Sequence, residues 1–251
     1  MALLVDQLQS PVSLEAEYPK KSTFVRKHID EFEPQAPPSY FEADTIGTAL
    51  HVINTERDAL ANLSHIYSTD VLARRNLAEA ISLISALPAK GGRLIVTGVG
   101  KSGKIAEKCV ATMNSLSVRS AFLHPTEALH GDMGMIGPAD ALLVLSYSGR
   151  TPELSAMIPH LPPIPRIIIS GQTDPSNCML LKVDPHLWTF LPAPIPVTEV
   201  QSFGVAAPTT STTVALALTD ALALAVARTL HTDPQAAFKR NHPGGAIGQG
   251  R

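Results

Sequence analysis

The chain has 251 residues, of which 45% are hydrophobic and only 5% aromatic, so we expect a core built mainly from aliphatic side chains. A formal net charge of −2 argues against nucleic-acid or membrane-surface binding through a basic surface. Two cysteines, Cys109 and Cys178, make neither a disulfide framework nor a metal cluster, and we expect both to be small buried hydrophobic residues.

The first 40 residues are charged, contain several prolines and lack hydrophobic periodicity. This composition predicts a disordered or loosely attached arm over residues 1–40, followed by one domain over residues 41–251. The apolar run at residues 1–5 is too short for a signal peptide. The most apolar stretch, residues 214–227, contains Asp220 and is typical of a buried core helix. We therefore expect a soluble cytoplasmic protein.

Helical periodicity covers residues 44–86 and predicts two helices. One face of the first carries six aliphatic residues: Ile46, Leu50, Ile53, Leu60, Leu63 and Ile66. Five short apolar runs follow, separated mostly by helical segments; they read RLIVTG, SAFLH, ALLVLS, RIIIS and LWTFL. Because apolar runs without polar alternation are typical of strands buried on both faces, they indicate a parallel sheet.

Two more helices are expected towards the C-terminus. The first is long and apolar, and Thr209 or Ser211 is its expected cap. The second is short and covers about residues 234–240. The predicted fold is α/β, with a helical lead-in followed by a three-layer αβα sandwich. In such sheets the ligand lies beyond the carboxyl ends of the strands, so the loops there are the candidate sites.

The loop TGVGKSG follows the first predicted strand and has the glycine spacing of a dinucleotide-binding turn. That interpretation requires an acidic residue after the second strand, where this chain has His124. A P-loop requires a glycine where the chain has Ile95. The loop then offers helix N-terminal amides, Lys101 and Ser102, which suit a phosphate. The alternative is a tight strand-to-helix turn with a solvent-facing lysine.

The loop SYSGRT follows the third predicted strand and carries three serine or threonine hydroxyl groups beside a glycine. Ser146, Ser148 and Thr151 are also ordinary helix-capping residue types. Three of them within six positions, at the favoured edge of the sheet, favour a phosphate-binding loop.

Other ionisable residues occupy loops after strands. His124 and His130 lie in HPTEALHGDMGMI, where their density favours acid–base or ligand contact. Glu153 falls in the first turn of a helix, where an acid also complements the helix dipole. Glu199 lies in a predicted loop without an obvious ion-pair partner. His242 lies in NHPGGAIG near the end of the sequence, where a helix cap explains the glycines and leaves the histidine unexplained.

Six motifs in order now resemble one family: GVGKSG, HPTEALHGDMGMI, SYSGRTPE, APTTSTT, DALA and NHPGGAIG. Together they resemble the sugar isomerase (SIS) domain of the arabinose-5-phosphate isomerases, over about residues 44–248. The resemblance implies a five-stranded parallel αβα sandwich that interconverts D-arabinose 5-phosphate and D-ribulose 5-phosphate. It also implies a homo-oligomer, commonly a tetramer, with active sites shared between subunits.

Matched motif by motif, the resemblance implies catalytic roles for four residues: Lys101, Glu153, Glu199 and His242. It implies phosphate binding by the hydroxyls of Ser102, Ser146, Ser148 and Thr151. His124 and His130 match histidines of the substrate pocket, and a metal such as zinc can occupy the first. The proposed chemistry requires no metal or organic cofactor.

The chain departs from the family pattern in three places. Many members read SNSGES where this chain has Tyr147 and Arg150 in SYSGRT. One additional residue follows Glu199 before APTT. Many members continue into paired CBS modules, whereas this sequence stops at Arg251, so we expect that half to be absent.

Several alternatives stay open. The domain is either an enzyme or a non-catalytic SIS module that binds or senses a sugar phosphate. As an enzyme, it acts on arabinose 5-phosphate or on another phosphosugar, such as a hexulose or heptulose phosphate. A dinucleotide enzyme is disfavoured by the missing acid. The sequence does not distinguish which glutamate, Glu153 or Glu199, is the base.

Overall fold

The computed structural model describes residues 39–245, and the side chains from residue 44. Most of the predicted arm therefore lies outside the described residues. The chain divides into two compact units, Met1–Ile46 and Gly47–Arg251. The sheet and the candidate site belong to the second unit.

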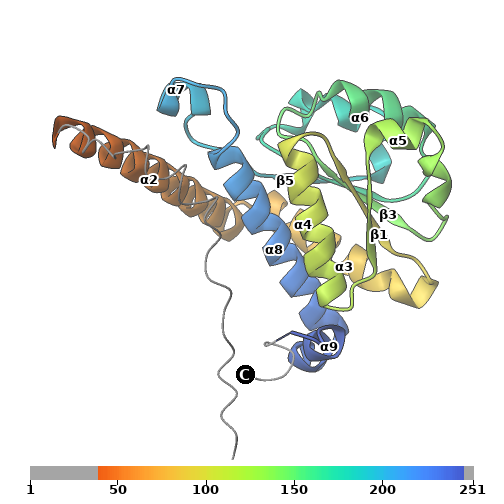
Figure 1. Cartoon of the computed structure of the whole chain (residues 1–251). Coiled ribbons are helices and arrows are strands. Elements are labelled where there is room, and N and C mark those ends of the chain that lie inside the picture. The colour runs from red at the N-terminus through yellow and green to blue at the C-terminus, as the bar shows by residue number, and fades with distance from the viewer. Residues whose placement is uncertain (1–38, 246–251) are drawn as a thin grey trace, which may run out of the picture. The chain divides into compact units, whose positions relative to one another are not determined.

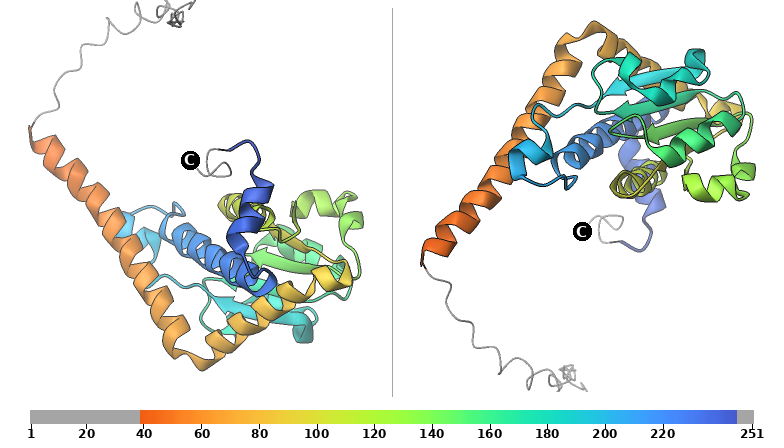
Figure 2. Two further views of the ribbon diagram at one scale, coloured as in Figure 1. Left: turned by 90° about the horizontal axis from the view of Figure 1, so that it is seen from below. Right: turned by 90° about the horizontal axis from the view of Figure 1, so that it is seen from above.

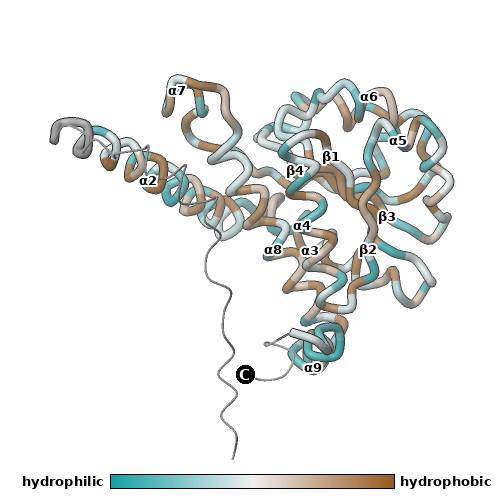
Figure 3. The backbone as a smooth tube through the Cα atoms, viewed as in Figure 1, coloured by the Kyte–Doolittle hydropathy of each residue, from teal (hydrophilic) through white to brown (hydrophobic). Residues whose placement is uncertain are grey.

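The centre of this unit is a five-stranded parallel sheet in the order β2-β1-β3-β4-β5. The strands are β1 (Leu94–Gly98), β2 (Ser120–Leu123), β3 (Ala141–Leu145), β4 (Arg166–Ser170) and β5 (Trp188–Pro192). Every residue of β1, β3 and β4 is buried, and the strands appear as hydrophobic tube segments in Figure 3. The five predicted strands and their parallel pairing are confirmed.

Helices cover both faces of the sheet (Figure 1). Those on one face are α3 (Val71–Ala86), α4 (Lys101–Ser115) and α8 (Thr210–Leu230), and those on the other are α5 (Pro125–Leu129) and α6 (Pro152–Met157). Successive strand residues point to opposite faces, so Val96 joins the first core cluster and Ile95 the second. This arrangement is the predicted three-layer αβα sandwich.

Helix α8 is long and apolar enough to cross a membrane by length and composition alone. Its inner face carries Val214, Leu218 and Leu222, which are buried in the first core cluster. Core helices pass the same test, and this burial is what we expected of residues 214–227.

Helix α2 (Ser39–Thr69) is the first of the two predicted lead-in helices. Its apolar face is only partly buried, because Leu63 is in the core while Leu50 and Ile53 are exposed. Near its end the Tyr67 hydroxyl donates to the carbonyl oxygen of Pro192 at 3.1 Å. This contact occupies a main-chain acceptor of β5, the strand at the edge of the sheet.

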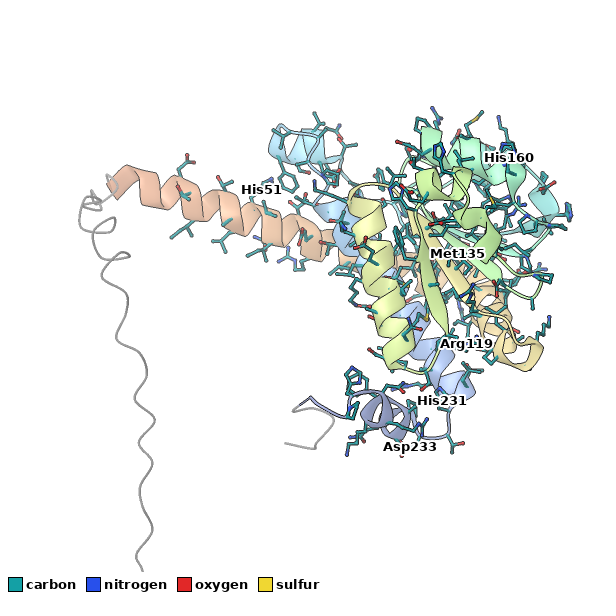
Figure 4. All side chains as sticks on the ribbon, turned by 45° about the vertical axis from the view of Figure 1, so that its right-hand side comes forward. His51, Arg119, Met135, His160, His231 and Asp233 are labelled. Atoms are coloured by element: carbon teal, nitrogen blue, oxygen red, sulfur yellow. The ribbon has the colours of Figure 1, made fainter. Side chains whose placement is uncertain are left out.

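Two short helices complete the unit, α7 (Glu199–Phe203) and α9 (Pro234–Asn241). Figure 4 labels His231 and Asp233 at the junction of α8 and α9. Asn241 donates from Nδ2 to the carbonyl oxygens of Asn114 and Ser115 at 3.2 and 3.1 Å. The end of α9 is therefore attached to the C-terminal end of α4, and the view from below in Figure 2 shows the blue α9 crossing close to α4.

Candidate functional site

The carboxyl ends of β1, β3, β4 and β5 border a cavity of about 320 Å³. From β1 the chain first adds a strand on one side, β2, and then crosses to the other side to add β3. Ligands bind at such a switch point in open α/β sheets. The polar residues that line the cavity come from the start of α4, the loop after β3, the end of β4 and the starts of α7 and α8: Lys101, Ser102, Ser146, Tyr147, Ser170, Glu199, Ser211 and Thr212.

The glycines of the first loop serve the turn between β1 and α4. A Cβ atom on Gly98 would lie 2.9 Å from the carbonyl carbon of Ser102, and one on Gly103 would lie 2.9 Å from the oxygen of Gly98. Gly100 has a backbone φ of +59°, which residues other than glycine rarely adopt. The glycine spacing therefore reflects a tight strand-to-helix turn, and it brings the N-terminus of α4 directly over the end of β1.

Lys101 is the first residue of α4 and lines the cavity with its exposed side chain. Within residues 44–245 its ammonium group has no hydrogen bond or ion pair. Ser102, its neighbour, also lines the cavity. An unpaired cation and a helix N-terminus together make this wall attractive to an anion.

The hydroxyl loop after β3 contributes Ser146, which is buried and lines the cavity. Its Oγ lies 2.8 Å from Oγ1 of Thr151. The Ser148 Oγ accepts from the amide of Arg150 at 3.2 Å. Ser148 and Thr151 do not line the cavity, so of the three predicted hydroxyls the structure places only Ser146 directly on it.

Glu199 lines the same cavity, and its place in the chain corrects our expectation of a loop. It is the first residue of α7, which a capping box between Thr198 and Gln201 begins. The T-x-x-Q spacing that marks this box was the sequence signal that we missed.

The Glu199 carboxylate is held at the start of α8. Its Oε1 accepts from the Thr209 amide at 2.9 Å, from the Ser211 amide at 3.0 Å and from the Ser211 hydroxyl at 2.6 Å. Thr209 occupies the N-cap position, but its hydroxyl has no partner within the described residues. Thr209 therefore holds the predicted N-cap position, but no side-chain hydrogen bond from it caps the helix, and the Glu199 carboxylate accepts from these amides instead. Its Oε2 has no hydrogen bond within the described residues.

Other predicted site residues lie outside this cavity. Glu153 is in the first turn of α6, as expected. His124 caps α5, where its Nδ1 accepts from the Thr126 amide at 3.3 Å, and His130 ends the same helix and is exposed. The part of the chain that the structure describes contains no group of three or more metal-ligating side chains. The residues around His124 thus do not fit a metal site within one chain.

His242 lies at the far end of α4 from the cavity. Its Nδ1 is 2.8 Å from the carbonyl oxygen of Phe238, its Nε2 is 3.4 Å from Oγ of Ser115, and its ring stacks on Phe238 at 3.9 Å. Ser115 is the last residue of α4 and Lys101 the first. Fifteen residues of helix measure roughly 22 Å at 1.5 Å per residue, so His242 and Lys101 do not meet within one chain.

Tyr147 is a cavity residue to which the sequence assigned no role beyond altering the loop. Its ring lies against Gly171, where a Cβ atom would be 2.1 Å from Cε2. Burial raises the pKa of Tyr147 and the charge of Glu199 raises it further, while a backbone hydrogen bond from Ile195 acts in the opposite direction. The phenol is therefore neutral at physiological pH and shares the cavity with the carboxylate.

Comparison with known proteins agrees with this geometry. The SIS domain model matches residues 88–162. The chain is 38% identical over 197 residues to a probable arabinose 5-phosphate isomerase of Haemophilus influenzae, covering 78% of this chain and 54% of that protein. It is 40% identical over 160 residues to the arabinose 5-phosphate isomerase KdsD of Salmonella typhi, covering 63% of this chain and 46% of that protein. The chain thus spans about half the length of these curated relatives.

A solved structure gives fuller coverage. The c3406 protein of E. coli CFT073, solved in complex with arabinose 5-phosphate, is 31% identical, with a TM-score of 0.61 over 80% of this chain and 98% of the other. This match covers nearly the whole of the second protein. The chain belongs to the SIS domain family.

Proposed function

We propose that this protein is a phosphosugar aldose–ketose isomerase that interconverts D-arabinose 5-phosphate and D-ribulose 5-phosphate, acting as a cytoplasmic homo-oligomer. The observation that carries the proposal is that Lys101 and Glu199 line one cavity together with the hydroxyls of Ser102 and Ser146. The names of the relatives support the choice of substrate.

The phosphate is bound between the first two loops. The N-terminus of α4 supplies main-chain amides and a partial positive charge. Ser102 and Ser146, on opposite sides of the β1–β3 boundary, supply hydroxyl donors. Thr151 acts indirectly, since it is hydrogen-bonded to Ser146. Because a dianion binds near these groups, the carbon chain extends from them across the cavity.

Proton transfer between C1 and C2 requires a base and a group that stabilises the enediolate. Glu199 is the better-placed of the two glutamates, because its Oε1 is anchored by three donors while Oε2 remains available. Lys101 stabilises the negative charge that develops on oxygen. A positioned general base contributes about 10²–10⁴-fold to the rate.

His242 and Glu153 require a second chain under this proposal. Within one chain His242 contacts Ser115 and Phe238, and Glu153 is outside the cavity lining. A tetramer with shared active sites brings such residues to a neighbouring cavity. In that arrangement His242 opens the sugar ring or moves protons between substrate oxygens.

Turnover with defined substrates tests the proposal. The purified protein is incubated with a panel of aldose and ketose phosphates, and the products are followed. Glu199→Gln and Glu153→Gln are then compared on the preferred substrate. We expect Glu199→Gln to lose about 10²–10⁴-fold in kcat. Near-normal turnover by both variants would disprove the carboxylate mechanism.

A non-catalytic SIS module that binds a sugar phosphate is the second candidate. The position of His242 favours it, because this residue faces away from the cavity within one chain. The two candidates differ in one measurement. Tight binding of arabinose 5-phosphate without any conversion to ribulose 5-phosphate would establish the module, whereas conversion establishes the enzyme.

A further inference from the structure

The Tyr147 ring lies at the ends of β3 and β4 and is partly exposed, with a relative exposure of 37%. The main-chain carbonyl oxygen of Tyr147 accepts from the Gly171 amide at 3.0 Å and from the Ser170 hydroxyl at 3.1 Å. A Cβ atom on Gly171 would lie 2.1, 2.4 and 2.6 Å from three atoms of the ring, so the ring rests on bare backbone. Glycine at this position is what permits the ring to lie there.

This ring lines the cavity together with groups at both ends of the proposed substrate. Ser146, the preceding residue, lines the cavity where the phosphate is proposed to bind. Glu199 lines the same cavity, and its charge acts on the phenol. The sugar carbons between phosphate and carbonyl therefore pass beside the Tyr147 ring.

The cavity is small, at about 320 Å³, which is near the lower limit of small-molecule sites. Its two chemical ends are anchored, Glu199 by the start of α8 and the phosphate loop by the end of β3. A ring on the wall of so small a cavity limits the number of carbons that fit between these two ends.

We propose that Tyr147 is a specificity-determining residue whose ring sets the chain length of the sugar phosphate, favouring five carbons over six. The inference rests on the proposed function of the cavity, but it concerns binding and does not require turnover. One additional methylene in a confined apolar space changes selectivity by about 10–200-fold.

The test uses two unreactive open-chain probes, a pentitol 5-phosphate and a hexitol 6-phosphate, with calorimetric measurement of Kd for the full chain. Three variants are compared with the parent protein. Tyr147→Ala removes the ring, Tyr147→Phe keeps the ring and removes only the hydroxyl, and Tyr67→Phe removes a phenol hydroxyl outside the cavity. If Tyr147→Ala fails to fold, Tyr147→Leu takes its place, because it keeps an apolar contact with Gly171.

We expect Tyr147→Ala to shift the ratio of the two Kd values towards the hexitol by at least about tenfold. Tyr147→Phe and Tyr67→Phe are expected to keep the parent ratio. An unchanged ratio in the Ala and Leu variants, or an equal shift in Tyr147→Phe, would overturn the inference. A parent protein that discriminates between the probes but converts no sugar phosphate would refute the proposed function and leave this inference standing.

Discussion

The two ends of α4 present opposite kinds of surface. At the N-terminal end, Lys101 projects into a cavity without a partner within residues 44–245. At the C-terminal end, Ser115 and His242 are engaged with each other and with α9. Unpaired charge at one end and satisfied polar groups at the other indicate that the first end is built for a ligand and the second, within one chain, for folding.

The largest change in activity is expected at the N-terminal end of α4. On the proposed mechanism Lys101→Met removes the cation that stabilises the enediolate, and it should lower kcat by about 10²–10³-fold, measured by conversion of arabinose 5-phosphate. Because the ammonium group has no protein partner within the described residues, the melting temperature should stay unchanged. A large fall in melting temperature would show that Lys101 supports the fold, and the contrast between the two ends would then be lost.

The second prediction asks whether the C-terminal end of α4 in one chain, with His242, contributes to the cavity beside Lys101 in another chain. Lys101→Met and His242→Asn are each expected to be nearly inactive alone. Mixing them under conditions of subunit exchange should restore part of the activity, because some cavities then receive an intact lysine and an intact histidine. Size-exclusion chromatography checks that both variants keep the parent assembly. If mixed samples recover nothing although subunits have exchanged, the shared site is wrong.

The third prediction concerns the turn that sets the start of α4. Gly98→Ala introduces a Cβ atom 2.9 Å from the main chain of Ser102, and backbone atoms cannot easily yield. We expect a loss of about 1–3 kcal/mol in the free energy of unfolding, measured by denaturant titration. Gly134→Ala is the matched control, since a Cβ atom there meets nothing within 4 Å. An equal loss of unfolding free energy in both variants would show that the close approach of Gly98 to Ser102 is not the cause.

The smallest effect is expected from pH, acting in the middle of α4. Burial raises the pKa of the Cys109 thiol from its ordinary 9.0 to about 12, with a further contribution from Asp220. The unfolded thiol loses its proton above about pH 9 while the folded thiol keeps it, so stability falls as pH rises between these values. The loss should be on the order of 1 kcal/mol at pH 10. Cys109→Ala should lack this part of the pH dependence, and an identical dependence would contradict the assignment.

The layers of this fold were predictable from sequence because the strands are buried on both faces. Continuous apolar runs such as ALLVL leave few structural alternatives. The cavity loops were predictable too, since carboxyl ends of parallel strands lie at one edge. Lys101, Ser102 and Ser146 were found in this way.

The positions of the other site residues depend on three-dimensional geometry that the composition of their loops does not predict. His242 follows α9, and nothing in NHPGG indicates that α9 ends beside Ser115 and away from Lys101. The helical setting of Glu199 was encoded in Thr198 and Gln201 but only over four residues, too short to produce a periodicity. The ring of Tyr147 lies beside the cavity only because Gly171, 24 positions later, leaves space for it.

The anchoring of Glu199 has a stereochemical consequence. Three donors fix Oε1, so the carboxylate cannot rotate to exchange its two oxygens during a reaction. On the proposed mechanism Oε2 therefore approaches the enediol from one side only. The proton removed from one carbon and the proton delivered to its neighbour would share a single face of the intermediate, so the aldose formed from ribulose 5-phosphate would have one configuration at C2.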